Sequence, residues 1–193
     1  VFDIGSSPGS WAEVACDATK SDPVQPQVVC IDLLSMNVPS GAQFLQGDFL
    51  QDLSQSVLLT TARRKFGLKG TGEFRTEDIP LLWDVTHNPA LNSVCVLSDM
   101  RMNTSGIKDL DHGRQVELCD EVLAFAKKLG DGLPLHSLSF VVKMTMGGEF
   151  EEFRERVRKA FPKHSVIKPK SSRPSSPELY IAAMKLYPKR TKN

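Results

Sequence analysis

The chain begins Val1-Phe2-Asp3-Ile4-Gly5-Ser6-Ser7-Pro8-Gly9-Ser10-Trp11, and this run indicates the class of fold. Residues 1–4 form a short, mostly apolar run typical of a buried strand. Residues 5–9 form a turn bounded by two glycines, and residues 11–19 can continue as a helix. A strand, glycine turn and helix in this order present backbone N–H groups at the carboxyl end of the strand, where α/β sheets bind nucleotide-like ligands.

The spacing of the glycines restricts the class of ligand that the turn can bind. It does not match G-x-G-x-x-G, the dinucleotide fingerprint, or the phosphate loop that ends in G-K-S/T. Gly5 and Gly9 are four apart with Pro8 between them, which suits a nucleoside ligand without a pyrophosphate. S-adenosylmethionine fits that description.

Length and composition predict one domain over residues 1–193, because a chain that is 40% hydrophobic can bury a single substantial core. No apolar run approaches the roughly 18 residues that a membrane span needs. The four cysteines contain no C-x-x-C, which favours buried free thiols, and the four histidines lack metal-ligand spacing. We expect a monomer without a metal.

Charge is distributed unevenly along the chain. Residues 1–153 carry 12 basic and 21 acidic side chains, a net charge of −9, whereas residues 154–193 carry 12 basic and 2 acidic ones, a net charge of +10. Such asymmetry favours a polyanionic partner, RNA or DNA, on the C-terminal side. A solvated helix face followed by a basic tail would explain part of it.

Short apolar runs alternate with helical patterns, as in an α/β sheet. Further strands are expected at residues 28–33, 43–46, 94–98, 139–144, 165–168 and 179–186. Helices are expected at residues 11–19, 50–64, 112–129 and 149–160. Residues 65–92 lack a clear period and predict an insertion, with a short helix around 78–83.

Two acidic residues follow the second and third expected strands. Asp32 stands where a doubly wound sheet holds an acid for ribose hydroxyls, although the cap of a helix is an alternative. Asp48 can accept a hydrogen bond from an adenine amine, cap the helix expected from Leu50, or do both.

Asp99 and Lys143 end two apolar strands. If those strands are neighbours, the two side chains meet at the mouth of the ligand site, where the amine can orient and deprotonate a hydroxyl. A plain buried ion pair is the alternative. Glu178 opens the last strand, after a loop whose hydroxyls and Arg173 can contact a phosphate backbone.

Together these residues resemble the FtsJ/RrmJ group of ribose 2′-O-methyltransferases, nearly end to end apart from residues 65–92. The matching motifs are Asp3-Ile4-Gly5 through Trp11, Ile31-Asp32-Leu33-Leu34, Phe44-Leu45-Gln46-Gly47-Asp48-Phe49, Leu97-Ser98-Asp99-Met100, Phe140-Val141-Val142-Lys143, and Ser171-Ser172-Arg173 with Glu178. Six motifs in the right order are specific, although any one alone would not be.

The resemblance implies a Rossmann-like methyltransferase fold, with a mostly parallel seven-stranded sheet and helices on both faces. It implies S-adenosylmethionine as cofactor, with contacts from Gly9, Trp11, Asp32, Asp48 and Asp99. The last three members of the family's Lys-Asp-Lys-Glu catalytic set map onto Asp99, Lys143 and Glu178. The first lysine lies upstream of the glycine turn in the family, so we expect the N-terminal part of the family domain to be absent from this chain.

The implied reaction is 2′-O-methylation of RNA ribose, and we expect Lys168, Lys170 and Arg173 to contact the RNA. Residues 103–112, which include Gly106-Ile107-Lys108-Asp109-Leu110-Asp111-His112, are most similar to the mitochondrial branch of the family. That similarity implies a uridine in the peptidyl-transferase loop of mitochondrial large-subunit ribosomal RNA, methylated in the matrix within a ribosomal particle.

Two alternatives remain at this point. One is a methyltransferase acting on transfer RNA or nucleolar ribosomal RNA, located in the cytoplasm or nucleolus. The other is an RNA-binding ribosome-assembly factor that keeps the fold without catalysis.

Overall fold

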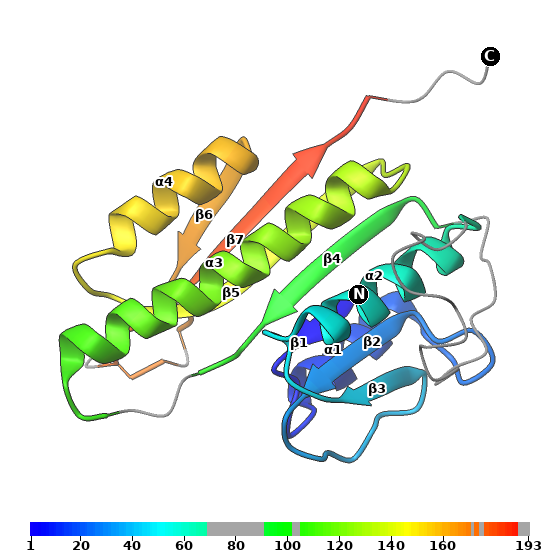
Figure 1. The fold of residues 1–193 in the computed structure, drawn as a ribbon, viewed down its shortest axis with the longest axis horizontal. Helices are drawn as coiled ribbons and strands as arrows, with labels where there is room; N and C mark the ends of the chain where they lie inside the picture. Colours follow the sequence, from blue (N-terminus) through cyan, green and yellow to red (C-terminus); the bar gives the residue numbers. More distant parts are fainter. Residues whose placement is uncertain (69–90, 102–104, 171, 174–175, 189–193) are drawn as a thin grey trace.

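The structure, a computed structural model, describes residues 1–68, 91–101, 105–170, 172–173 and 176–188. Its strands are β1 (Phe2–Ile4), β2 (Val28–Asp32), β3 (Ala42–Gln46), β4 (Ser93–Ser98), β5 (Ser137–Thr145), β6 (Lys163–Ile167) and β7 (Glu178–Leu186) (Figure 1). Its helices are α1 (Ser10–Thr19), α2 (Asp52–Lys65), α3 (Lys108–Gly132) and α4 (Phe150–Ala160).

The strands form one seven-stranded sheet in the order β3-β2-β1-β4-β5-β7-β6. Strands β1 to β5 are parallel to one another, and β7 runs antiparallel to both β5 and β6. The strand order reverses between β1 and β4, and this is the point at which open α/β sheets bind ligands. The predicted mostly parallel seven-stranded sheet is confirmed.

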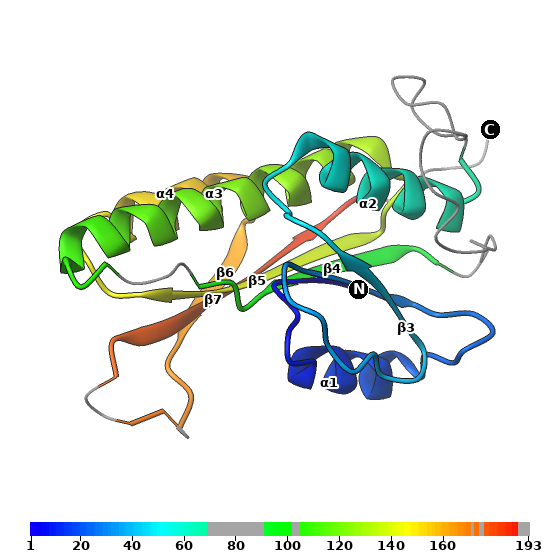
Figure 2. The same cartoon turned by 60° about the horizontal axis from the view of Figure 1, so that its bottom comes forward.

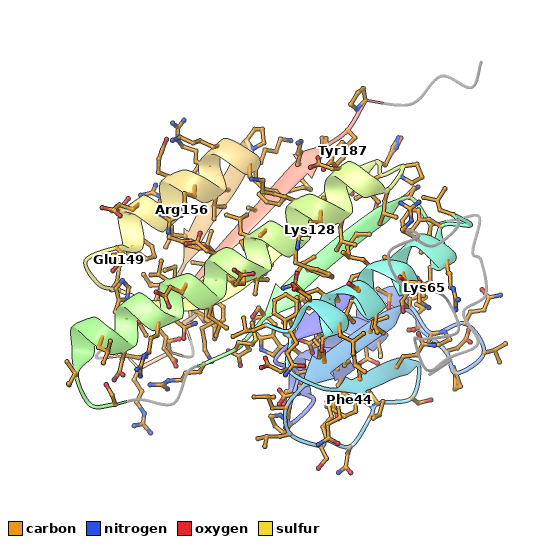
Figure 3. The ribbon with its side chains drawn as sticks, viewed as in Figure 1. Phe44, Lys65, Lys128, Glu149, Arg156 and Tyr187 are labelled. Carbon is orange, nitrogen blue, oxygen red and sulfur yellow. The ribbon has the colours of Figure 1, made fainter. Side chains whose placement is uncertain are left out.

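Helices cover both faces of the sheet, as expected. Figure 2 shows α2, α3 and α4 on one face and α1 on the other. Successive side chains of β2 point to opposite faces of the sheet, and both faces are apolar. Val29 and Ile31 join the core under α2–α4, while Val28 and Cys30 pack against α1. Side chains fill the space between the sheet and the three covering helices (Figure 3).

Helix α3 is longer than predicted, and tertiary contacts explain both ends. At its start, Asp111 accepts hydrogen bonds from Ser105 and from the backbone of Gly106, which fixes an additional turn. At its end, Gly130 does not stop the helix: a Cβ there would collide with the hydroxyl of Tyr187. That glycine permits close packing, so the prediction of an end at residue 129 was wrong.

Other bounds differ by a few residues. Strand β5 extends over nine residues because every one of them pairs with β7, including the polar ends that hydrophobicity alone does not mark. Helix α2 starts at Asp52, two residues later than predicted. Residues 69–90, where the insertion and its short helix were predicted, lie outside the described residues. No helix within the described ranges is long and apolar enough to cross a membrane.

Candidate active site

The glycine turn after β1 has the backbone that its sequence predicts. Gly5 has φ +77° and Gly9 has φ +118°, a region that side chains with a Cβ rarely adopt. A Cβ on Gly5 would also collide with Met100, which follows β4. Gly9 is the N-cap of α1, so the turn directs the N–H groups of the first helical residues towards the carboxyl edge of the sheet.

Asp32, the last residue of β2, is bound to this turn. One of its carboxylate oxygens accepts a hydrogen bond from the backbone N–H of Ser7 at 2.9 Å, and the other accepts from Leu34 at 2.8 Å. The segment between β2 and β3 contains no helix, so the alternative that Asp32 caps a helix is wrong. Each carboxylate oxygen has two acceptor positions, so Asp32 retains capacity for ribose hydroxyls.

Asp48 lies beyond β3 at the same edge of the sheet, since the N–H of Gly47 bonds to the carbonyl of Asp32 at 2.9 Å. Its carboxylate accepts a hydrogen bond from the N–H of Leu50 at 3.0 Å. The N-cap of α2 is Gln51, which makes no side-chain capping bond. Asp48 therefore closes a turn before α2 and does not cap it.

Asp99 and Lys143 meet, as their positions at the ends of two strands predicted. Strands β4 and β5 pair in parallel up to Ser98 and Val142, and the next residues along these strands form an ion pair. The Lys143 side chain is 16% exposed and the Asp99 side chain 33%, so the pair is largely, but not fully, shielded from solvent.

Glu178 lies near this pair because β7 pairs with β5. Glu178 is opposite Thr145, and one of its oxygens lies 3.8 Å from a guanidinium nitrogen of Arg101. Arg101 follows β4, so the ion pair links the segment after Asp99 to the start of β7. The sequence alone did not assign a role to Arg101.

Tyr180 is a second residue that the sequence alone did not single out. It is opposite Lys143 in the β5–β7 register, and its ring lies 5.8 Å from that of Trp11, measured between centroids. Burial, followed by the charges of Asp99 and Glu178, raises the pKa of the Tyr180 hydroxyl. The only available signal was its position two residues after Glu178, where alternation places both side chains on one face.

Asp3 lies beneath the site on β1 and is fully buried. Within the described residues, neither of its carboxylate oxygens has a hydrogen-bond partner. Burial, followed by the charges of Asp99 and Asp32, raises its pKa to about 7. A carboxyl group in this position exchanges its proton near neutral pH.

The cations predicted to bind RNA lie on the loop between β6 and β7, at the same end of the sheet. Lys168, Lys170 and Arg173 are exposed. The amine of Lys168 also donates a hydrogen bond to the carbonyl of Ser176 at 3.1 Å. Glu178 begins the strand after this loop, so the loop leads directly to the predicted catalytic residues.

These features suit the adenosine part of a nucleoside cofactor. Because Gly5 and Gly9 lack a Cβ, a nucleoside can approach the backbone of the turn closely. Beside the turn, the carboxylate of Asp32 offers hydrogen-bond acceptors. Comparison with known proteins identifies the chemistry: a profile of FtsJ-like methyltransferases matches residues 1–186.

The chain belongs to the FtsJ-like methyltransferase family.

Its relatives include two bacterial proteins named ribosomal RNA large subunit methyltransferase E. The protein of Acinetobacter baylyi is 36% identical over 183 residues, covering 94% of this chain and 68% of the relative. The protein of Azoarcus sp. is 34% identical over 187 residues, covering 96% and 75%. The family assignment makes this chain a methyltransferase that uses S-adenosylmethionine, as predicted.

Solved structures support the same fold. The crystal structure of a putative ribosomal RNA methyltransferase from Plasmodium falciparum superposes with a TM-score of 0.59 at 20% identity, covering 96% of this chain and 85% of that one. Human methyltransferase-like protein 13, in complex with SAH, gives a TM-score of 0.50 at 11% identity, covering 100% and 73%.

Proposed function

We propose that the protein transfers a methyl group from S-adenosylmethionine to a ribose 2′-hydroxyl of large-subunit ribosomal RNA. The observation that carries the proposal is the Asp99–Lys143 ion pair, which lies at the carboxyl edge of the sheet beside the glycine turn. The names of the bacterial relatives support ribosomal RNA as the substrate class.

In this proposal, each residue has a role that follows from its position. Gly9, Trp11, Asp32 and Asp48 hold the cofactor, which supplies an electrophilic methyl group when bound. Lys143, once in its neutral amine form, orients the 2′-hydroxyl and accepts its proton, while Asp99 holds the Lys143 amine; the methyl group passes to the ribose oxygen and S-adenosylhomocysteine leaves. Glu178 positions the target from β7, supported by Arg101. The rate gain comes mainly from holding the hydroxyl in line with the methyl group.

The test is Lys143→Met, because methionine keeps the apolar stem and removes the amine. The variant should fold and bind the cofactor normally, yet lose methyl transfer by about 10²–10⁴-fold, the range for a general base. Lys128→Met is the matched control, since Lys128 lies on α3 and contacts Gln55. A Lys143→Met variant with parental rates would falsify the role of Lys143.

The same assay separates the alternatives. Methylation of transfer RNA, with large-subunit ribosomal RNA left unmethylated, would show that transfer RNA is the substrate and would leave the proposed mechanism unchanged. Binding of RNA and cofactor without any transfer would support an assembly factor.

We further infer a uridine in the peptidyl-transferase loop of mitochondrial large-subunit ribosomal RNA as the target, methylated within a particle in the matrix. Residues 103–112 support this narrower inference through their similarity to the mitochondrial branch. Mapping ribose methylation on total RNA with and without the protein tests it. The inference would be contradicted if a ribose methylation of cytoplasmic ribosomal RNA disappeared without the protein while the methylation of organellar RNA stayed the same.

A further inference from the structure

Among the described residues of the basic C-terminal part, cations lie at both ends of the sheet. Lys168, Lys170 and Arg173 lie at the end that carries Lys143. Lys185 lies near the other end, because it is opposite Leu138 at the start of β5. Lys143 is five positions after Leu138 along the strand, a distance of about 17 Å.

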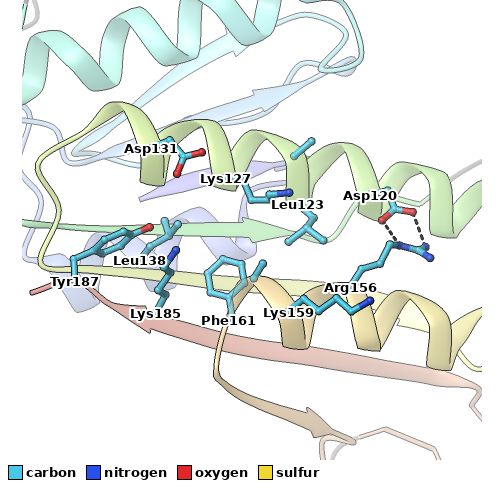
Figure 4. A pocket seen from close by; sticks show the side chains of 12 residues that line it. Asp120, Leu123, Lys127, Asp131, Leu138, Arg156, Lys159, Phe161, Lys185 and Tyr187 are labelled. Atoms are coloured by element: carbon cyan, nitrogen blue, oxygen red, sulfur yellow. Dashed lines mark hydrogen bonds and ion pairs between the residues drawn. The ribbon is translucent and has the colours of Figure 1, made fainter.

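A groove of about 450 Å³ opens at this second end, between α3, α4 and the end of β7 (Figure 4). Leu123, Leu138 and Phe161 form its apolar lining, and all three side chains are nearly fully buried. Tyr187 closes one end of the groove, and its hydroxyl is partly desolvated. The groove therefore has an apolar floor beside a polar rim.

The rim is cationic. Its charged members are Lys127, Arg156, Lys159, Lys185, Asp120 and Asp131. Arg156 and Asp120 neutralise each other through two hydrogen bonds of 2.8 and 2.7 Å. Three lysines then face one remaining carboxylate, a net charge of +2 on the part of the rim that the structure describes.

Lys127 and Lys185 reach into the groove from opposite sides, one from α3 and the other from β7 (Figure 4). Neither forms an ion pair within the described residues. The amine of Lys185 lies 5.0 Å from the centroid of the Tyr187 ring, which keeps it close to the aromatic surface. Two amines on the rim of one groove fit a phosphodiester chain, because each can neutralise a phosphate.

We propose that this groove binds the phosphate backbone of the RNA substrate, away from the nucleotide that reacts. The inference rests on the proposed RNA substrate and adds a second contact site on the α3–α4 face of the sheet. Side chains alternate along β5, so Lys143 faces the α1 side while Leu138 faces α3. An RNA that reaches both sites must extend from one face of the sheet to the other, which a folded ribosomal RNA can do and a short oligonucleotide cannot.

The experiment compares the double variant Lys127→Ala/Lys185→Ala with the parent, using a folded transcript of a large-subunit ribosomal RNA domain and a short single-stranded oligonucleotide. For the transcript, the slope of log affinity against log salt should fall by about two, one unit for each phosphate that is no longer neutralised. Binding of the short oligonucleotide and of the cofactor should not change. Lys127→Arg/Lys185→Arg should restore the slope.

Arg114→Ala/Lys128→Ala is the matched control, since it removes two charges from the other flank of α3, where Asp52, Glu117 and Glu121 surround them. It should keep the parental slope. An unchanged slope for Lys127→Ala/Lys185→Ala would overturn the proposal, as would equal losses of affinity for the oligonucleotide and the transcript. Methylation of the transcript by the parent is measured in parallel, so failure of the proposed function is visible separately from failure of the groove.

Discussion

Gln115 on α3 donates a hydrogen bond from its side-chain amide to the main-chain carbonyl of Lys143, with 3.3 Å between nitrogen and oxygen. The same nitrogen donates to the carbonyl of Met100 at 3.0 Å. Pairing between β4 and β5 ends at Ser98 and Val142, so both carbonyls lie just beyond the paired strands. Gln115 thus connects the two strand ends that carry Asp99 and Lys143.

Replacing Gln115 by leucine should destabilise the protein by about 1–3 kcal/mol, because the carbonyls of Met100 and Lys143 lose a buried donor. Chemical denaturation measures this change. Gln43→Leu is the control, since Gln43 is also buried but its amide oxygen has no hydrogen-bond partner among the described residues. Equal effects of the two changes would show that the bonds of Gln115 contribute little.

Asp3 should make stability depend on pH. Its pKa rises from 3.8 to about 7 on folding, so the folded state binds more protons than the unfolded state between these values. The free energy of unfolding should therefore fall as pH increases from about 4 to about 7, by up to about 4 kcal/mol.

Asp3→Asn should remove this fall and leave the protein more stable than the parent at pH 8, because the amide carries no charge. Denaturation at several pH values checks the slope. Asp17→Asn on the exposed side of α1 should keep the parental pH dependence. A parent whose stability is constant from pH 4 to 7 would contradict the raised pKa of Asp3.

Asp32→Ala should weaken binding of S-adenosylmethionine by roughly 1.5–3 kcal/mol, the range for hydrogen bonds to a charged group. Titration calorimetry measures this affinity. The change also removes the bond to Ser7, so thermal unfolding should be recorded alongside. Parental affinity in a folded Asp32→Ala variant would exclude Asp32 as the ribose contact.

Alanine at Lys168, Lys170 and Arg173 should weaken binding of different RNAs alike and flatten its salt dependence, by about one unit of slope for each cation that had paired with a phosphate. Fluorescence anisotropy over a range of salt concentrations measures the slope. Binding of the cofactor should not change, because its predicted ligands lie outside this loop. If the slope is that of the parent, this loop does not bind phosphates.

The local features of the fold and the residue types of the site follow from the order of residues along the chain. Two glycines at positive φ encode the turn after β1, and short apolar runs encode the parallel strands. Since parallel strands end at one edge of a sheet, the positions of Asp99 and Lys143 at strand ends were enough to predict that they meet.

Which other side chains surround that pair depends on the packing of the folded chain. Tyr180 faces Lys143 because of the antiparallel register of β7, and a register shift of one residue would move it to the other face. Gln115 reaches the carbonyl of Lys143 from a helix 28 residues earlier in the chain, and the close approach of Tyr187 explains Gly130 within α3. Such contacts depend on how helices and strands pack against one another. Hydrophobic periodicity and turn formation, in contrast, depend on residues that are close together in the chain.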